Sequence, residues 1–102
     1  MAFIIIYITH KNLKEAKKIT NYLLEKKLIA CANFFPIEST YWWKNKITNS
    51  KEIVSIVKTK NENWGKVKSE VKKLHPYECP CIMKINVEAN EDYENWVNSE
   101  TE

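Results

Sequence analysis

The sequence contains no arginine, because all 16 of its basic residues are lysine. Arginine supplies the planar fork of N–H donors that binds guanine edges, phosphates and carboxylates in bidentate fashion. With 13 acidic residues, the formal net charge is only +3, which is too weak to indicate binding to nucleic acid or to a membrane surface. We therefore expect neither a nucleic-acid partner nor a membrane partner.

Glycine is nearly absent as well, since Gly65 is the only one in 102 residues. A Gly-rich phosphate loop is thus excluded, and so is the Lys/Arg-Gly-aromatic segment with which RNA-recognition domains bind RNA. An acylphosphatase-type enzyme would need an arginine phosphate cradle after its first strand, where this chain has His10-Lys11-Asn12. Without a paired nucleophile and base or a zinc signature, we predict that the chain is not an enzyme.

Cysteine is scarce and unevenly placed, with Cys31 alone and Cys79 and Cys81 two residues apart. An odd number in this spacing is a poor disulfide framework, so reduced thiols and a cytoplasmic location are the simpler interpretation. Long apolar runs are also missing. The run from Phe3 to Ile8 is too short for a signal sequence or a membrane span, and it predicts a buried strand.

The chain does have a globular composition, with 44% hydrophobic residues and four tryptophans, in a length that fits one domain over residues 1–102. Runs of aromatic and β-branched residues predict strands, and apolar residues at helical spacing predict helices. The predicted elements are a strand over 3–9, a helix over 13–27, a strand from 28 that is interrupted at Pro36 and resumes over 41–43, a strand over 53–59, a helix up to residue 74, a strand over 81–87 and a short C-terminal helix.

Asparagines mark several of the predicted boundaries. Asn12 begins a capping-box pattern, and Asn61 and Asn90 are the predicted caps of the second and third helices. Residues 44–46 are a turn candidate, because asparagine tolerates the left-handed conformation that tight hairpins need. The polar residues 48–50 are either a bulge or part of a long, protruding hairpin arm, and Pro36 marks a bulge or a sheet edge.

The order β-α-β-β-α-β-α predicts an α+β fold of ferredoxin-like topology, in which two helices cover one face of a four-stranded antiparallel sheet. The strands are apolar on both faces. In the first strand, Phe3, Ile5 and Tyr7 point to one face of the sheet, and their apolar neighbours point to the other. Soluble monomers rarely leave such a face in water. The short C-terminal helix offers too few apolar residues to cover it, so we predict an oligomer.

Five segments, in order, resemble the CutA family of divalent-cation-tolerance proteins. They are ACAN (Ala30–Asn33), YWW (Tyr41–Trp43), KTK (Lys58–Lys60), HPYECP (His75–Pro80) and DYENW (Asp92–Trp96). Each motif alone is weak, but their order and their placement on the predicted elements are specific, and together they span most of the chain.

The resemblance implies a homotrimer whose sheets face inward, similar to PII signal proteins. It also implies a role in tolerance to divalent metals, copper especially, with no established catalysis and no obligatory cofactor. The alternative is a PII-like signalling protein that binds a small ligand in the cleft between subunits. Asn45 replaces the family's usual glycine, and Cys79 and Cys81 lie where the family often has other residues.

Four side chains are candidate metal ligands. Cys31 is either a soft copper ligand or a small buried hydrophobe. His75, Cys79 and Cys81 offer three soft or borderline donors close together, although zinc sites usually space their cysteines further apart. The alternative places Cys79 in a loop and Cys81 in the core. His10 is expected to be solvated unless folding brings it near His75 or a cysteine.

The resemblance places Lys58, Tyr77, Glu78 and Trp96 around the cleft between subunits, where they form either a small-molecule site or a structural ion pair. Three consecutive aromatic residues, Tyr41, Trp42 and Trp43, are the predicted anchors of the trimer interface.

Overall fold

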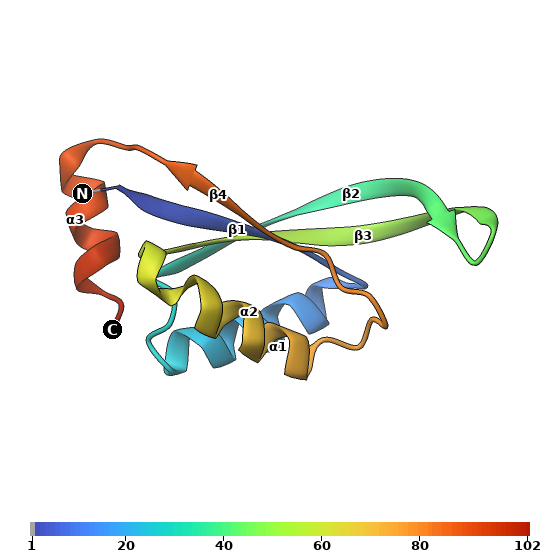
Figure 1. Ribbon diagram of the computed structural model, residues 1–102, viewed down its shortest axis with the longest axis horizontal. Coiled ribbons are helices and arrows are strands. Elements are labelled where there is room, and N and C mark those ends of the chain that lie inside the picture. The colour runs from blue at the N-terminus through green and yellow to red at the C-terminus, as the bar shows by residue number, and fades with distance from the viewer. Residues whose placement is uncertain (1) are drawn as a thin grey trace.

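The computed structural model describes residues 2–102 and contains the elements in the predicted order. Four strands form one antiparallel sheet in the order β2-β3-β1-β4, and α1 and α2 lie together on one side of it (Figure 1). This arrangement confirms the ferredoxin-like α+β fold. The elements are β1 (Phe3–His10), α1 (Leu13–Glu25), β2 (Cys31–Trp43), β3 (Lys46–Thr59), a 3-10 turn (Asn61–Asn63), α2 (Trp64–Leu74), β4 (Ile82–Val87) and α3 (Glu91–Ser99).

Helix α1 begins as predicted and ends two residues early. The side-chain oxygen of Asn12 accepts a hydrogen bond from the backbone N–H of Glu15 at 2.8 Å, which satisfies one of the free donors of the first turn. At the other end Lys27 adopts φ 58°, a left-handed conformation that stops the helix. Leu28 and Ile29, predicted to open the next strand, are instead buried in the core before β2 begins.

The predicted cap of the second helix is wrong. Asn61 lies in the 3-10 turn, and α2 starts at Trp64. Asn63 ties this junction down, because its side-chain NH₂ donates to the Leu28 carbonyl at 3.2 Å and to the Thr59 hydroxyl at 3.1 Å. The turn is therefore fixed by contacts across the fold, which a local sequence pattern does not contain. Asn90 is the N-cap residue of α3, as predicted.

The core lies between the helices and the covered face of the sheet. Its residues are 0–6% exposed, and each contributes about 1.5–3 kcal/mol by leaving water. The sheet provides every second residue of β1 together with Val57 of β3, and the helices provide the apolar stripes of α1 and α2. The members are Ile4, Ile6, Ile8, Ile19, Leu23, Leu28, Ile29, Val57, Val67 and Val71.

Strands β2 and β3 form the long hairpin arm, which extends past the helices (Figure 1). The pairing is continuous from Cys31↔Lys58 to Trp43↔Lys46, including Pro36↔Ile53. Of the two alternatives at Pro36, the edge is right and the bulge is wrong, because β2 lies at the sheet edge, where a missing N–H is tolerated. Residues 48–50 likewise belong to the arm and are not a bulge.

The opposite face of the sheet, the open face, carries apolar side chains with no helix layer over them. The largest are Phe35, Met83 and Ile85, which are 40%, 47% and 46% exposed. On the arm Tyr41, Trp42, Trp43 and Ile47 are exposed as well, with Trp42 at 72%. The predicted apolar face is thus present. Within one chain Phe3 and Val54 are buried on it, Phe3 against Tyr93 of α3, and the large side chains named above stay uncovered.

Candidate functional site

Polar groups gather at both ends of the sheet, and we name each group by its residues. The lysine end comprises Lys58 at the end of β3 with Cys31, Asn33, Tyr93 and Trp96 around it. The histidine–tyrosine end lies where β1 finishes and the loop over residues 75–81 runs from α2 to β4. Its members are His10, Glu52, Ser55, His75 and Tyr77.

At the lysine end, the Lys58 ammonium donates a 2.6 Å hydrogen bond to the side-chain oxygen of Asn33 and lies 5.4 Å from the centre of the Tyr93 ring. Tyr93 in turn packs on Trp96, with 5.6 Å between ring centres, and Trp96 is 42% exposed. Cys31 faces Lys58 across the β2–β3 pair. A cation beside aromatic rings and an amide is suited to hold a small anion, because the ammonium keeps donors to spare.

At the histidine–tyrosine end, the two imidazoles stack with ring centres 5.5 Å apart. His10 pairs through Nε2 with the Ser55 hydroxyl at 2.8 Å. His10 and Ser55 are 1% and 0% exposed, so the pair has no access to a substrate. His10 is therefore not solvated, and folding brings it beside His75.

The hydrogen bonds fix His75 in one neutral form. Its Nε2 lies 2.7 Å from the Thr9 carbonyl, which can only accept, so Nε2 carries the proton. Its Nδ1 then accepts the backbone N–H of Tyr77 at 3.2 Å. Both ring nitrogens are occupied, so His75 binds a metal only if one of these bonds breaks.

Burial first, and the neighbouring His75 second, lower the pKa of His10 to about 4. Nδ1 of His10 is buried and has no hydrogen-bond partner among the described residues. A protonated His10 would place an unpaired charge in the core. His10 is therefore neutral at physiological pH.

Tyr77 closes this end on the side of the open face. Its hydroxyl donates to the Glu52 carboxylate at 2.7 Å, and Glu52 is 8% exposed. Burial is the main cause that raises the pKa of Tyr77, and Glu52 and Tyr41 raise it too. The phenol is therefore a fixed hydrogen-bond donor and does not act as a base.

The four predicted metal ligands do not meet in one chain. Cys31 is at the lysine end, His75 is occupied by its own hydrogen bonds, and only Cys79 and Cys81 lie near each other. All three cysteines are free thiols. In the part of the chain that the structure describes, no three His, Cys, Asp or Glu side chains are grouped so as to hold a metal ion.

The four predicted cleft residues are also separated. Lys58 and Trp96 belong to the lysine end, whereas Tyr77 is hydrogen-bonded to Glu52. Glu52 and Lys58 are six residues apart along β3, which is about 20 Å of extended strand. Glu78 lies 4.0 Å from Lys44 of the arm, and both side chains are more than 70% exposed. These residues form one site only if two chains bring opposite ends together.

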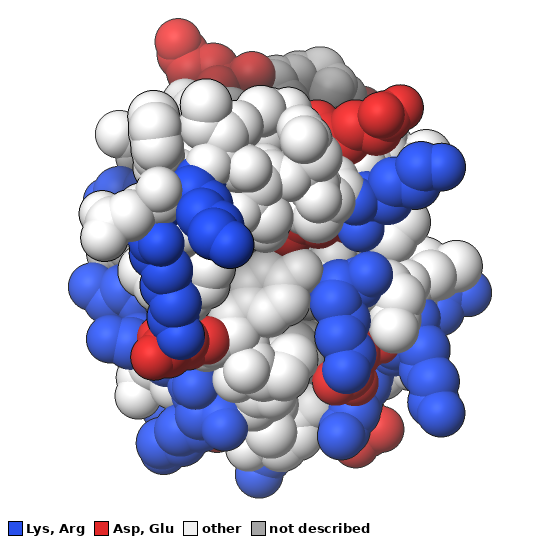
Figure 2. All heavy atoms as spheres, turned by 90° about the vertical axis from the view of Figure 1, so that its right-hand side faces the viewer, with Lys and Arg blue, Asp and Glu red and all other residues white. Residues whose placement is uncertain are grey.

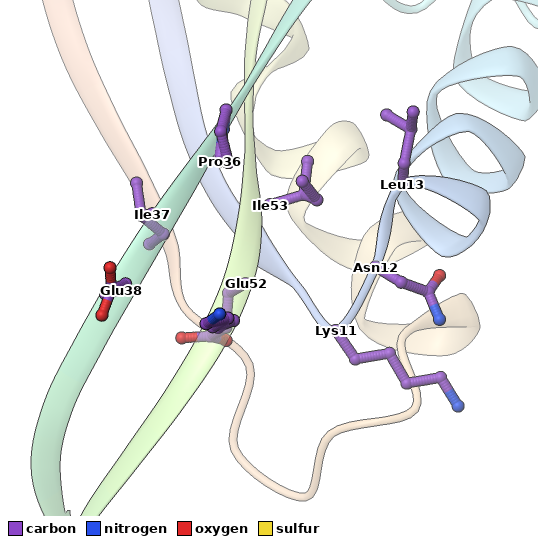
Figure 3. Close-up of a pocket in the computed structure, with 9 residues that line it drawn as sticks. Lys11, Asn12, Leu13, Pro36, Ile37, Glu38, Glu52 and Ile53 are labelled. Atoms are coloured by element: carbon purple, nitrogen blue, oxygen red, sulfur yellow. The ribbon is translucent and has the colours of Figure 1, made fainter.

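A shallow hollow of about 600 Å³ lies where the arm leaves the helices. Lys11, Asn12 and Leu13 form one wall, and the two strands of the arm form the other, with Glu38, Glu52 and Ile53 among its residues (Figure 3). Its charges are of both signs. Seen from the tip of the arm, lysines flank a strip of uncharged side chains on both sides, with smaller acidic patches among them and at the top of the view (Figure 2). This side of the molecule therefore carries charges of both signs.

Several site residues were missed at the level of sequence. Glu52, Ser55, Asn33 and Tyr93 all contact a predicted site residue or His10. The side of the sheet to which Ser55 points could have been predicted. Ser55 is two residues from both Ile53 and Val57, so it must share their face. The other contacts depend on strand register and on the path of the loop over residues 75–81, which spacing alone does not give.

Known proteins resemble this chain over nearly its whole length. A family described as "CutA1 divalent ion tolerance protein" matches residues 4–100. The chain belongs to the CutA1 family. A CutA1 relative from Archaeoglobus fulgidus named "Divalent-cation tolerance protein CutA" is 45% identical over 98 residues, which cover 95% of this chain and 96% of the relative. A relative of the same name from Pyrococcus horikoshii is 42% identical, covering 96% and 97%.

Solved CutA1 structures share the fold closely. The periplasmic divalent cation tolerance protein CutA from Archaeoglobus fulgidus has a TM-score of 0.94 at 44% identity, with full coverage of both chains. CutA1 from Oryza sativa has a TM-score of 0.95 at 30% identity, covering 100% of this chain and 95% of the other. In this CutA1-family chain, no helix among residues 2–102 is both long and apolar enough to cross a membrane.

Proposed function

We propose that this chain serves tolerance to divalent cations as a homotrimer that binds metal, copper in particular, and catalyses no reaction. The names of its relatives support the tolerance role. Reduced thiols in all three cysteines favour a cytoplasmic location. We further propose that no cofactor is obligatory, and that nucleic acid and membranes are not partners.

The observation that carries the trimer is the uncovered open face. Phe35 on the edge strand β2, and Met83 and Ile85 on the edge strand β4, are 40–47% exposed on a sheet whose other face is sealed. A contiguous apolar surface of this kind marks an interface in soluble proteins. Further copies of the same chain are the partners that supply a matching apolar face.

The arm supplies the anchors for this assembly. Tyr41 and Trp43 share the open face, whereas Trp42 pairs with Ile47 and points to the other side. Tryptophan and tyrosine are the residues that contribute most at interfaces. We propose that all three aromatic residues are covered in the trimer, so that the arm is held on both faces by its neighbours.

Native mass spectrometry of protein purified without added metal tests the assembly and the metal separately. The expected mass is three times the 12.1 kDa chain, and added copper should bind in steps. An Ile85→Asp variant should shift the mass to one chain, because it places charges in the proposed interface. A wild-type monomer would refute the trimer, and a trimer that takes up no copper would refute direct metal binding.

The alternative function is PII-like signalling through a small ligand between subunits. The lysine end favours it, because Lys58 and the exposed Trp96 face solvent beside an apolar surface. In a trimer, Lys58 and Trp96 of one chain would meet Tyr77 and Glu78 of another. The same spectra test this function, since a small anion retained by the wild type and lost in Lys58→Met would support it.

A further inference from the structure

The lysines of the chain are segregated from much of its acidic charge. Residues 88–102 contain six of the 13 acidic residues and no lysine. All 16 lysines therefore lie in residues 1–87, where only seven acidic residues oppose them, so this part has a formal net charge of +9. The small net charge of the whole chain thus conceals a strongly cationic part.

The solvent-exposed side of α2 concentrates several of these lysines. A shallow hollow of about 430 Å³ is lined by Lys68, Ser69, Lys72 and Lys73, which are all exposed, and no acidic residue is among the described residues that line it. We call it the lysine hollow. Helix α2 lies on the side of the sheet opposite the open face (Figure 1). A trimer built through the open face would therefore leave the lysine hollow in water.

The spacing of the lining residues lets their polar groups converge. Lys68 and Lys72 are four residues apart on one helix, and so are Ser69 and Lys73. Each pair therefore lies on adjacent turns, with Cβ atoms about 5–6 Å apart. Ammonium groups only donate hydrogen bonds. The hollow thus offers donors to several oxygen atoms of one anion.

Two of the three lysines are already held by other side chains. The Lys68 ammonium lies 4.9 Å from the centre of the Trp64 ring, and Lys73 donates a 3.0 Å hydrogen bond to Glu70. The other carboxylate oxygen of Glu70 accepts from the Tyr22 hydroxyl of α1 at 2.6 Å. Side chains that are oriented in advance lose less conformational freedom when they bind a ligand.

Helix polarity accounts for only part of this pattern. Lysines in the last turn, here Lys72 and Lys73, stabilise the negative end of a helix. Lys68 lies one turn earlier and repels Lys72, since like charges four residues apart destabilise a helix. Neither Lys68 nor Lys72 has an acidic residue three or four positions away. A multiply charged anion between them would supply the missing negative charge.

We propose that the lysine hollow binds a small polyphosphate anion, in which neighbouring phosphoryl groups carry several negative charges. Lysine binds phosphate as a point charge, and the three ammonium groups match several phosphate oxygens, whereas a single carboxylate has only two oxygens. Trp64 is partly buried beside Lys68 and is not an exposed ring for stacking on a nucleic-acid base. This site goes beyond the proposed metal role and needs neither a metal nor a second chain.

Isothermal titration calorimetry of the metal-free, full-length protein with inorganic tripolyphosphate tests the site. The wild type should bind one tripolyphosphate per chain, more tightly than orthophosphate, and added salt should weaken the binding. A Lys68→Gln/Lys72→Gln variant should bind about tenfold more weakly or worse, because it loses charge-assisted hydrogen bonds. Glutamine has nearly the helix propensity of lysine, and circular dichroism checks that each variant is folded.

The matched control is Lys17→Gln/Lys18→Gln, which removes the same charge from exposed positions of α1 and should bind as the wild type does. Equal weakening in both double variants would overturn the site, because the attraction would then be diffuse. Unchanged binding in Lys68→Gln/Lys72→Gln, or no binding by the wild type, would overturn it too.

Displacement of tripolyphosphate by a single-stranded oligonucleotide at equal phosphate concentration would show a nucleic-acid surface instead, which also contradicts the proposal. The expected result is that the oligonucleotide competes poorly. Native mass spectra of the same samples keep the assembly separate. A trimer that binds no tripolyphosphate refutes only this site, whereas a monomer that binds it refutes only the proposed assembly.

Discussion

The two faces of the sheet carry the same kind of side chain and differ in what lies over them. On the covered face Ile4, Ile6 and Ile8 are 0–1% exposed, whereas on the open face Met83 and Ile85 are nearly half exposed. The pattern of apolar residues along a strand therefore indicates which side chains must be buried, but it does not indicate whether a helix or another subunit covers them. The covered face stabilises the chain, and the open face retains hydrophobic free energy that only association can release.

The largest effect should separate the two faces directly. Ile6→Ala should lower the free energy of unfolding by about 2–5 kcal/mol, because it leaves a cavity in the sealed core. Ile85→Ala acts on the open face. The stability that this variant loses should depend on protein concentration if the face is an interface. Urea unfolding at two protein concentrations measures both. Equal, concentration-independent losses would contradict the distinction.

The second largest effect should be a loss of folding stability in acid, caused by His10 at the end of the covered face. The pKa of His10 is about 4 in the folded chain and about 6.5 when unfolded. The unfolded chain thus binds the proton more tightly than the folded chain. The contribution of neutral His10 to folding stability is therefore complete above pH 6.5 and is lost as the pH falls toward 4. Between pH 7.5 and 4.5 we expect a loss of about 2–3 kcal/mol.

Urea unfolding across this pH range checks the loss, with His10→Gln as the control. The amide keeps hydrogen-bonding capacity but does not titrate near neutral pH. The variant should therefore show a flatter pH dependence than the wild type. If both proteins lose stability equally, groups other than His10 carry the acid sensitivity.

A smaller effect is expected where the open face is partly sealed. Tyr77→Phe removes the donor to the nearly buried carboxylate of Glu52, which should destabilise the chain by about 1–2 kcal/mol. Glu52→Gln neutralises the acceptor, so the two substitutions together should cost less than their sum. Thermal unfolding of the two single variants and the double variant measures this coupling. Strict additivity would mean that the hydrogen bond contributes nothing.

The smallest effect should come from the lysine end. Lys58→Met breaks the hydrogen bond to Asn33 in a solvated setting, so stability should change by only about 0.5 kcal/mol. Thermal unfolding measures this change. The matched control is Lys84→Met on β4, because the Lys84 ammonium donates a comparable hydrogen bond to Asn61. A loss several times larger, confined to Lys58, would show that this end is closed off from water in the assembled protein.

The sequence was informative about elements and faces, and less so about sites. The order of strands and helices, the capping role of Asn12 and the two-faced apolar pattern followed from spacing. The stacking of His10 on His75 did not, because residues 65 positions apart meet only once the loop over residues 75–81 takes its path over the end of β1. The separation of Lys58 from Tyr77 likewise depends on strand register, which composition does not encode.

The turn at the tip of the arm also has a consequence for which aromatic residues face a neighbour. Lys44 and Asn45 adopt φ values of 50° and 64°, as in a two-residue turn of type I′, and this turn sets the pairing of every residue behind it. A slip of one residue in β2 would exchange Trp42 with Tyr41 and Trp43 between the two faces. The handedness of two backbone angles thus decides which aromatic surface the molecule offers to its surroundings.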